Sequence, residues 1–430
     1  MSLTLKIGIA GLGTVGAGVV KIIDQHAAML SARCGRDLVV TSVSARDRGK
    51  KRGIDLSNFA WLDDPAKLAT ATNVDVVVEV IGGSEGPALD VVTAAIAAGK
   101  SVVTANKALI ARHGAALGTA AEAAGVALNF EAAVAGGIPV IKLLREGLAA
   151  NANDHVFGIL NGTCNYILTE MEKTGRDFND VLADAQALGY AEADPTFDVD
   201  GIDTAHKLAI LASVAFGAVV DFKSVYTEGI RQISAEDIQF AAELGYRIKL
   251  LGIARLYNGA IEQRVHPCMV PLDTAIAHVD GVTNAVVIEG DRAGRTVIEG
   301  QGAGEGPTAS SVVADIMDIA RGVLSPPFGH PSDQLHLFRP LEQDNHEGRY
   351  YIRLEVLDQS GVMADITAVL RDQEVSVASF IQRGRAPGEQ VSVVILTHTA
   401  GEGCMKQSLE LIESLDSVVE PPRMIRIKHL

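Results

Sequence analysis

The residues between Gly189 and Lys207 include five carboxylates and one lysine. Asp203 and Lys207 are four positions apart, so on a helix their side chains lie on the same face, one turn from each other. Residues 208–216 are apolar on every side, which is typical of a helix that is buried all round. Because a buried charge is costly unless it is paired or used in chemistry, we expect Asp203 and Lys207 to belong to a functional site. A purely structural helix ion pair is the competing interpretation.

A glycine-rich turn follows an alternating apolar stretch at residues 5–9 and precedes apolar positions at helical spacing. This order of strand, turn and helix indicates dinucleotide binding, in which backbone N–H groups and the helix N-terminus receive the pyrophosphate. The expected cofactor contacts in the turn are Gly11, Gly13, Thr14, Val15 and Gly16.

The strand predicted over residues 38–44 is followed by Arg46, and an arginine at this place accommodates the 2′-phosphate of NADP. NADP is therefore the expected cofactor, with NAD use also possible, and a solvated charged loop at residues 46–52 is the alternative interpretation. Two further strands end at Gly82 and Lys107. Ligands bind beyond the carboxyl ends of parallel strands, and a lysine at a helix start opposes the helix dipole, so both residues are candidates for function.

The chain of 430 residues is predicted to be an α/β protein with three domains. Residues 1–132 form a doubly wound, parallel Rossmann-type domain for NAD(P), and a helix at about residues 306–325 packs back on it. Residues 133–305 contain hairpin turns at 257–260 and 291–294, which indicate an α+β domain with an open, largely antiparallel sheet for substrate binding and dimerisation. A linker at residues 331–348 precedes residues 349–430, whose order β-α-β-β-α-β, with a turn at Ala386-Pro387-Gly388, predicts a ferredoxin-like fold.

Charge and composition narrow the kinds of partner. The formal net charge of −16 argues against nucleic acid and against an anionic membrane surface, so small molecules are expected. The first residues read directly as a strand without a signal peptide, and the longest apolar run, near residues 208–220, is too short to cross a bilayer. We therefore expect a cytoplasmic protein. The four cysteines are far apart and predict free thiols rather than disulfides or a zinc site.

The chain closely resembles the bacterial homoserine dehydrogenases that carry a C-terminal ACT domain, over nearly its whole length. The resemblance rests on a family signature in the acidic segment, where glycine and an aromatic residue precede Asp-Pro-x-x-Asp-x-x-Gly-x-Asp-x-x-x-Lys. The matching residues are Gly189, Tyr190, Asp194, Pro195, Asp198, Gly201, Asp203 and Lys207. Ala185 lies one place further out than in some members of the family.

This resemblance implies roles for residues of the catalytic site. Lys207 and Lys107 would flank the reacting carbonyl, with Lys207 as the commonly described proton donor, and Asp203 would contact the substrate. Further substrate contacts are implied at Glu192, Asp198, Tyr190, Thr163 and Gly162, and further cofactor contacts at Lys107, Gly189 and Gly304.

The resemblance also implies two sites away from the reacting carbonyl. Glu131 resembles the side-chain ligand of a structural sodium ion, completed by the backbone carbonyls of Val134, Gly136 and Ile138. From the residues alone, a hydrogen-bonded buried acid is the alternative at Glu131. The first turn of the ACT domain, Asp358-Gln359-Ser360-Gly361, would bind an amino-acid effector, threonine, and provide feedback control.

The implied reaction interconverts L-homoserine and L-aspartate 4-semialdehyde in threonine and methionine biosynthesis. Adding hydride to the aldehyde leaves an alkoxide, which a lysine in a dry cleft stabilises and protonates. Which lysine delivers the proton does not follow from the sequence. The alternatives are a thioester-forming semialdehyde oxidoreductase that uses Cys164 and a noncatalytic ACT sensor of amino acids. Unpaired sheet edges predict a homodimer or homotetramer.

Overall fold

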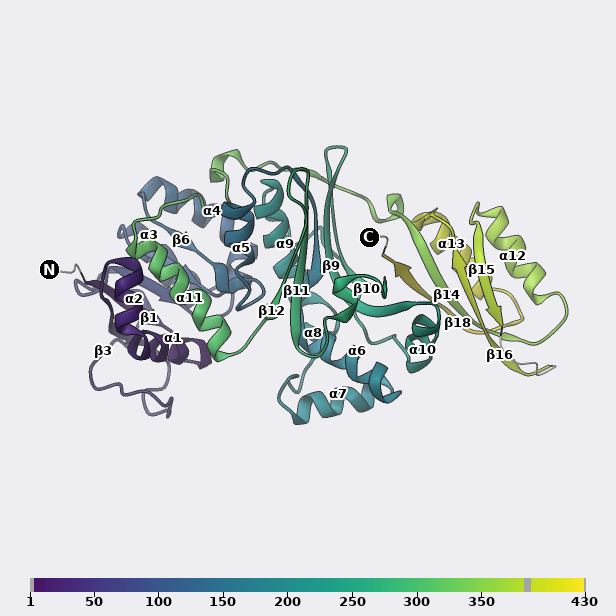
Figure 1. Cartoon of the computed structure of the whole chain (residues 1–430), viewed down its shortest axis with the longest axis horizontal. Coiled ribbons are helices and arrows are strands. Elements are labelled where there is room, and N and C mark those ends of the chain that lie inside the picture. Colours follow the sequence, from purple (N-terminus) through teal and green to yellow (C-terminus); the bar gives the residue numbers. More distant parts are fainter. Residues whose placement is uncertain (1–3, 383–387, 429–430) are drawn as a thin grey trace.

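The computed structural model describes residues 4–382 and 388–428. Its three parts follow one another along the longest axis, with the N-terminal parallel sheet at one end and the C-terminal strands at the other (Figure 1). Within the described residues, no helix combines the length and the apolar character needed to span a membrane.

The N-terminal part is a parallel sheet of six strands in the order β3-β2-β1-β4-β5-β6. These strands are β1 (Leu5–Ala10), β2 (Leu38–Ser44), β3 (Ala60–Trp61), β4 (Val76–Glu79), β5 (Ser101–Thr104) and β6 (Leu128–Asn129). Val76 and Val78 pack in the hydrophobic cluster of one face, whereas Val77 packs in that of the other. Since both faces are covered, the strands are apolar throughout. The strand order confirms the predicted Rossmann-type fold.

Helices from distant parts of the sequence cover this sheet. One face carries α1 (Thr14–Gln25), α2 (Ala27–Cys34) and α11 (Glu305–Ala320), and the other carries α3 (Pro87–Ala97) and α4 (Lys107–Ala124). Figure 1 shows α11 beside the N-terminal helices, although the chain passes through the whole middle part before reaching it. Val312 and Ile316 of α11 share a hydrophobic cluster with Ile7 and Val19.

The middle part is an antiparallel sheet with helices. Its main strands are β7 (Asn153–Ile159), β9 (Tyr246–Tyr257), β10 (Ala260–Pro271), β11 (Thr283–Gly290) and β12 (Gly294–Gln301). Its helices are α5 (Val140–Lys142), α6 (Gly162–Thr174), α7 (Phe178–Ala187), α8 (Thr196–Val199), α9 (Ile202–Phe216) and α10 (Ala235–Glu243), and the short strands β8 (Tyr226–Thr227) and β13 (Arg339–Pro340) pair with β10. Both predicted hairpins are confirmed, and Asn258 and Gly259 take the positive φ angles, 50° and 74°, that a two-residue hairpin turn requires. The predicted helix at residues 208–216 is likewise confirmed as the buried part of α9.

The C-terminal part has four main strands in the order β18-β14-β16-β15. Its elements are β14 (Glu347–Leu357), α12 (Val362–Asp372), β15 (Val377–Gln382), β16 (Gln390–Thr397), β17 (Ala400–Gly401), α13 (Glu402–Glu413) and β18 (Val418–Ile427). Neighbouring main strands are antiparallel, and one helix follows β14 and another follows β16, which is the ferredoxin-like plan. Ala386 and Pro387 of the predicted turn lie outside the described residues.

The last strand contains two prolines, although proline cannot donate to a sheet. β18 begins at Val418, and Pro421 and Pro422 lie opposite the single residue Leu354, between the pairs Arg353–Arg423 and Glu355–Glu420. The prolines therefore occupy a β-bulge, where proline is tolerated. β14 begins at Glu347, so its first two residues fall within the predicted linker.

The middle and C-terminal parts share one sheet of 12 strands, because β10 pairs in parallel with β18. A buried carboxylate lies at this junction. Glu402, the first residue of α13, is 0% exposed and accepts hydrogen bonds from Arg264 of β10 at 2.5 Å and from Arg426 of β18 at 2.7 Å. Burial opposes the charge of Glu402, but the two arginines outweigh it and lower the pKa of Glu402 to about 2.

We predict that Glu402→Gln destabilises the junction by roughly 3–5 kcal/mol at pH 7, because it leaves two buried guanidinium groups without their shared charge. Urea unfolding with wild type and Glu410→Gln, an exposed glutamate on the same helix, measures the effect. Since the folded pKa of Glu402 is depressed, its contribution is complete above the ordinary value of 4.5 and is lost as the pH falls towards 2. Equal unfolding midpoints for the two variants at pH 7 would contradict this account.

Candidate active site

The turn between β1 and α1 has the backbone geometry that a pyrophosphate requires. Gly11 has a φ of 102°, and a Cβ there would lie 2.5 Å from the carbonyl oxygen of Val80. A Cβ on Gly16 would lie 2.0 Å from the carbonyl oxygen of Gly11, so only glycine fits at either position. Gly13 precedes α1 without a side-chain cap, which leaves the first N–H groups of the helix available to an anion. The turn therefore fits the phosphates of a dinucleotide.

A buried carboxylate organises the loops beside this turn. Glu79, the last residue of β4, accepts hydrogen bonds from the Thr104 hydroxyl at 2.6 Å and from the Ile81 N–H at 2.7 Å. Burial raises the pKa of Glu79, and these hydrogen bonds oppose the shift. Asn106 donates to the Gly83 carbonyl at 2.6 Å and caps the start of α4. These contacts hold the loop containing Gly82 and the helix that begins at Lys107 at the same edge of the sheet.

Asp203 binds two lysine ammonium groups. Lys207 Nζ lies 2.7 Å from Asp203 Oδ2 and also donates to the Leu160 carbonyl at 2.8 Å, so the predicted contact on one face of the helix is confirmed. Lys107 Nζ, from the N-terminal part, lies 2.6 Å from Asp203 Oδ1. Burial opposes the charge of Asp203, but the two ammonium groups outweigh burial and hold the pKa of Asp203 well below its usual range.

Asn161 connects Asp203 to a second carboxylate. Its Nδ2 donates to Asp198 Oδ1 at 2.8 Å and to Asp203 Oδ2 at 2.9 Å. Its Oδ1 accepts the Cys164 N–H at 2.8 Å, which caps α6. Burial raises the pKa of Asp198, while the hydrogen bond from Asn161 opposes this shift. One amide therefore fixes both carboxylates and the start of the helix.

A cavity of about 500 Å³ opens beside these groups. The predicted site residues that line it are Lys107, Gly162, Thr163, Gly189, Tyr190, Asp198, Asp203, Lys207 and Gly304. Asn161, Asn284 and Gln301 also line it and were not singled out from the sequence. Asn161 is the N-cap of α6, where asparagine is preferred, so a search for helix starts would have found it. Asn284 and Gln301 are strand residues without any pattern that indicates function.

Several predicted residues lie elsewhere. Glu192 is exposed and is not among the residues that line this cavity, so its contact with substrate stays a prediction. Arg46 is exposed directly after β2, in a loop that Arg52 joins to the glycine turn by donating to the Leu12 carbonyl at 2.8 Å. Residues 358–361 form the connection between β14 and α12, which is far from the cavity along the sheet.

Cys164 lies behind the cavity wall. The residue is 0% exposed, and its thiol donates to the Asp198 carbonyl at 3.2 Å. Burial, together with the nearby carboxylate of Asp198, raises the pKa of the thiol well above its ordinary value. Because the thiolate is the nucleophilic form, this environment disfavours the thioester-forming alternative.

The predicted sodium ligands belong to a buried loop at residues 131–138. Ala135 and Gly136 have φ angles of 54° and 49°, which bend the backbone sharply. The Glu131 carboxylate accepts the N–H groups of Ile141 and Lys142, each at 2.8 Å, as the hydrogen-bonded alternative expects. Burial and the neighbouring Asp315 raise the pKa of Glu131 to about 7. Across the part of the chain that the structure describes, no group of three or more His, Cys, Asp or Glu side chains could hold a metal ion.

A dinucleotide fold that brings its own Lys107 to Lys207 of the middle part, beyond the carboxyl edge of its sheet, defines an NAD(P)-dependent oxidoreductase. Residues 11–131 match the family model "Homoserine dehydrogenase, NAD binding domain", and residues 139–317 match "Homoserine dehydrogenase". Homoserine dehydrogenases from Neisseria gonorrhoeae and Pseudomonas aeruginosa are each 45% identical to this chain, over 99% of it and 99% of their own length. The chain belongs to the homoserine dehydrogenase family.

Solved structures agree with this assignment. A homoserine dehydrogenase from Thiobacillus denitrificans superposes with a TM-score of 0.93 at 45% identity, covering 99% of this chain and 98% of that one. A hyperthermophilic archaeal homoserine dehydrogenase in complex with NADPH gives a TM-score of 0.64 at 28% identity, covering 75% of this chain and 100% of that one.

Asn161 provides a test of how the site is held. Asn161→Ser keeps a capping hydroxyl for α6 but removes the amide that bridges Asp198 and Asp203. We predict that it lowers kcat/KM for reduction of aspartate 4-semialdehyde about tenfold or more, because hydrogen bonds to charged groups are worth roughly 1.5–3 kcal/mol. The thermal unfolding midpoint should change little. A kcat/KM equal to that of wild type would show that the bridge does not position the site.

Proposed function

We propose that the chain catalyses the NAD(P)-dependent interconversion of L-homoserine and L-aspartate 4-semialdehyde, a step of threonine and methionine biosynthesis. One observation supports this most directly: Asp203 holds the ammonium groups of Lys107 and Lys207 within 2.6 and 2.7 Å, beside a cavity that residues of the dinucleotide part and the middle part line together. The bound dinucleotide would supply the hydride in one direction and take it up in the other.

The chain's own groups meet the needs of an aldehyde that becomes an alkoxide. An ammonium group has three hydrogens, and Lys207 directs two of them to Asp203 and Leu160. The third remains to stabilise the developing oxyanion and to protonate it. The ammonium group of Lys107 contacts the same carboxylate and adds a second positive charge, which polarises the substrate's carbonyl. The Asp198 carboxylate lines the cavity, and its negative charge suits the substrate's ammonium group. Glu192 is proposed as a second carboxylate for the same group.

The cofactor proposed is NADP, with NAD also accepted. The support is Arg46, an exposed cation directly after β2, at the place where a 2′-phosphate would lie. Rates with NADPH and NADH in the assay below compare the two directly.

A structural sodium ion is proposed at Glu131, with the carbonyls of Val134, Gly136 and Ile138. The support is chemical: Glu131 and Asp315 are two buried carboxylates close enough for Asp315 to raise the pKa of Glu131, and a cation would relieve this repulsion. The bent backbone at Ala135 and Gly136 is what carbonyl ligands to a hard cation require.

We also propose that residues 349–430 are an ACT module that binds threonine at residues 358–361 and reduces activity. The ferredoxin-like strand order and the surface position of Gln359, Ser360 and Gly361 support this. The proposed homodimer or homotetramer is supported by β12 and β15, which lie at the two ends of the long sheet and carry the exposed apolar side chains of Val297 and Phe380.

The catalytic proposal is tested by NADPH oxidation with aspartate 4-semialdehyde. Lys207→Met and Lys107→Met should each lower kcat, roughly 10²–10⁴-fold for the residue that transfers the proton, because acid catalysis typically contributes that much. Lys173→Met, which replaces an exposed lysine paired with Glu170, is the matched control and should retain wild-type kcat. Absence of turnover in wild type, or near-normal kcat in both site variants, would overturn the proposal.

The regulatory proposal has a separate readout. Threonine should inhibit wild type, and Asp358→Asn should raise the half-inhibitory concentration about tenfold, because it removes a charge that would pair with the effector's ammonium group. Asp372→Asn, an exposed acid at the end of α12, serves as the control. If threonine has no effect on wild type, it is not the effector, and if the two variants respond alike, the effector does not bind at residues 358–361. The catalytic proposal is unaffected in either case.

A further inference from the structure

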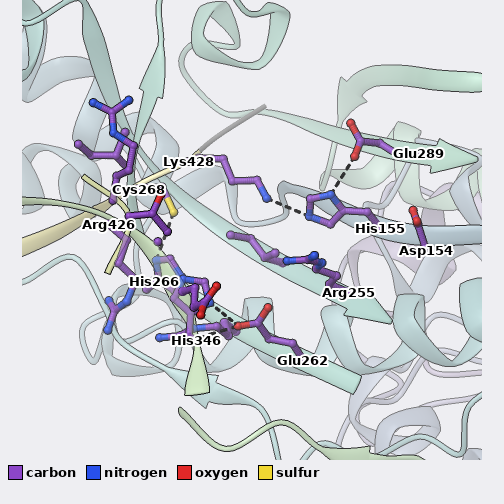
Figure 2. A pocket seen from close by; sticks show the side chains of 17 residues that line it. Asp154, His155, Arg255, Glu262, His266, Cys268, Glu289, His346, Arg426 and Lys428 are labelled. Atoms are coloured by element: carbon purple, nitrogen blue, oxygen red, sulfur yellow. Dashed lines mark hydrogen bonds and ion pairs between the residues drawn. The ribbon is translucent and has the colours of Figure 1, made fainter. Parts of the chain in front are cut away.

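A second cavity, of about 430 Å³, lies where the middle sheet meets the C-terminal strands. It is distinct from the cavity beside Asp203, and the two share none of their lining residues. Figure 2 shows His155 of β7, Arg255 of β9, His266 of β10 and Lys428, which directly follows β18, around it. None of these residues takes part in the proposed chemistry.

Lys428 enters this cavity without a carboxylate partner. Its Nζ lies 2.9 Å from His155 Nε2, and His155 Nδ1 lies 2.9 Å from the Glu289 carboxylate. Nδ1 therefore carries the hydrogen and Nε2 accepts from Lys428. Burial and the charge of Lys428 lower the pKa of His155 to about 4, so the ring is neutral. No ion pair joins Lys428 to a carboxylate of the described residues, and its Nζ lies 4.8 Å from the centre of the Phe157 ring, so at least one hydrogen of a positive ammonium group remains unused.

Two buried side chains on β10 each have one nitrogen without a partner. His266 is 2% exposed and Arg264 is 3% exposed, and His266 Nε2 and Arg264 Nε have no hydrogen-bond partner. His266 Nδ1 lies 3.0 Å from the Pro267 carbonyl oxygen, which can only accept, so Nδ1 carries the ring hydrogen and Nε2 is an acceptor. Arg264 Nε is an unpaired donor. Native proteins leave few buried polar atoms unsatisfied, so two along one strand, on a cavity wall, indicate a ligand.

In the inner part of this cavity, unused donors outnumber unused acceptors. Its inner carboxylates are engaged, Glu262 with His346 at 2.6 Å and Glu289 with His155 and Arg295. Asp154 and Glu347, the other acids that line it, are exposed. Arg255 is exposed on the wall, stacks on Tyr257 at 4.6 Å, and forms no ion pair with a described residue. The balance of free groups therefore favours an anion over a cation.

We propose that this cavity is a binding site for a small oxyanion, either inorganic phosphate or the carboxylate of a small organic acid, held by Lys428, Arg255 and Arg264. An oxyanion offers several acceptor atoms and would satisfy the ammonium group of Lys428 and the unpaired Nε of Arg264 together. Because Lys428 directly follows β18 while Arg264 lies on β10, the anion would join the C-terminal strands to the middle sheet.

Calorimetric titration of the full chain tests this, with inorganic phosphate and succinate as separate probes at constant ionic strength. The protein is saturated with NADP⁺ so that the glycine turn is occupied. Wild type should bind at least one probe saturably, and Lys428→Met should weaken that binding about tenfold, the loss expected for one charge-assisted hydrogen bond. Arg255→Met should weaken it too, and because Arg255 is exposed this variant should fold even if Lys428→Met does not.

Lys173→Met should bind as wild type does. Binding of phosphate alone identifies a phosphate site, binding of succinate alone identifies a carboxylate site, and binding of both identifies a general oxyanion site. Two results would overturn the proposal. One is the absence of saturable binding by either probe. The other is equal affinity in wild type, Lys428→Met and Arg255→Met, which would locate the anion elsewhere.

Discussion

A buried carboxylate that must neutralise two cations is the constraint on which the catalytic site depends. Asp203 has one lysine on its own helix and a second, Lys107, at the start of a helix in the N-terminal part. A buried charge is costly when unpaired, so contact between the two parts is favoured when both ammonium groups reach this carboxylate. The same contact places two positive charges where the cavity opens. Docking of the parts and stabilisation of an oxyanion thus rest on one set of atoms.

A second buried carboxylate with two cations lies at the junction of the middle and C-terminal parts. Glu402 accepts from Arg264 of the middle sheet and Arg426 of the C-terminal sheet, beside the parallel pairing of β10 with β18. In each case the carboxylate is buried and its two cations come from different segments. One cavity is lined by Asp203 and its two lysines, and the other is lined by the two arginines that bind Glu402.

Strand β7 connects these two regions. His155, which contacts Lys428, lies near its start, whereas Leu160 and Asn161, which contact Lys207 and Asp203, directly follow its end. A short, buried strand that pairs on both sides is a rigid link between the anion cavity and the catalytic cavity. A shift of the C-terminal strands against the middle sheet would therefore be transmitted to the catalytic site through few intervening residues.

Local patterns in the sequence determined the parts of this protein that depend on neighbouring residues. The glycine turn, both hairpins, the buried helix α9 and the Asp203–Lys207 contact all follow from spacing within one segment, because helical and strand periods fix which side chains share a face. The place of Lys107 at a strand end also made it a candidate, and family resemblance added its role and most of the cavity lining. Tertiary structure alone decided the Lys107–Asp203 distance, the bridging role of Asn161, the Glu79 network and the bulge that carries Pro421 and Pro422 into β18. It also decided that two predicted domains share one sheet. The period of apolar residues shows that one face of a helix or strand is buried, but it does not show which distant segment covers that face. These contacts form only when that segment packs there.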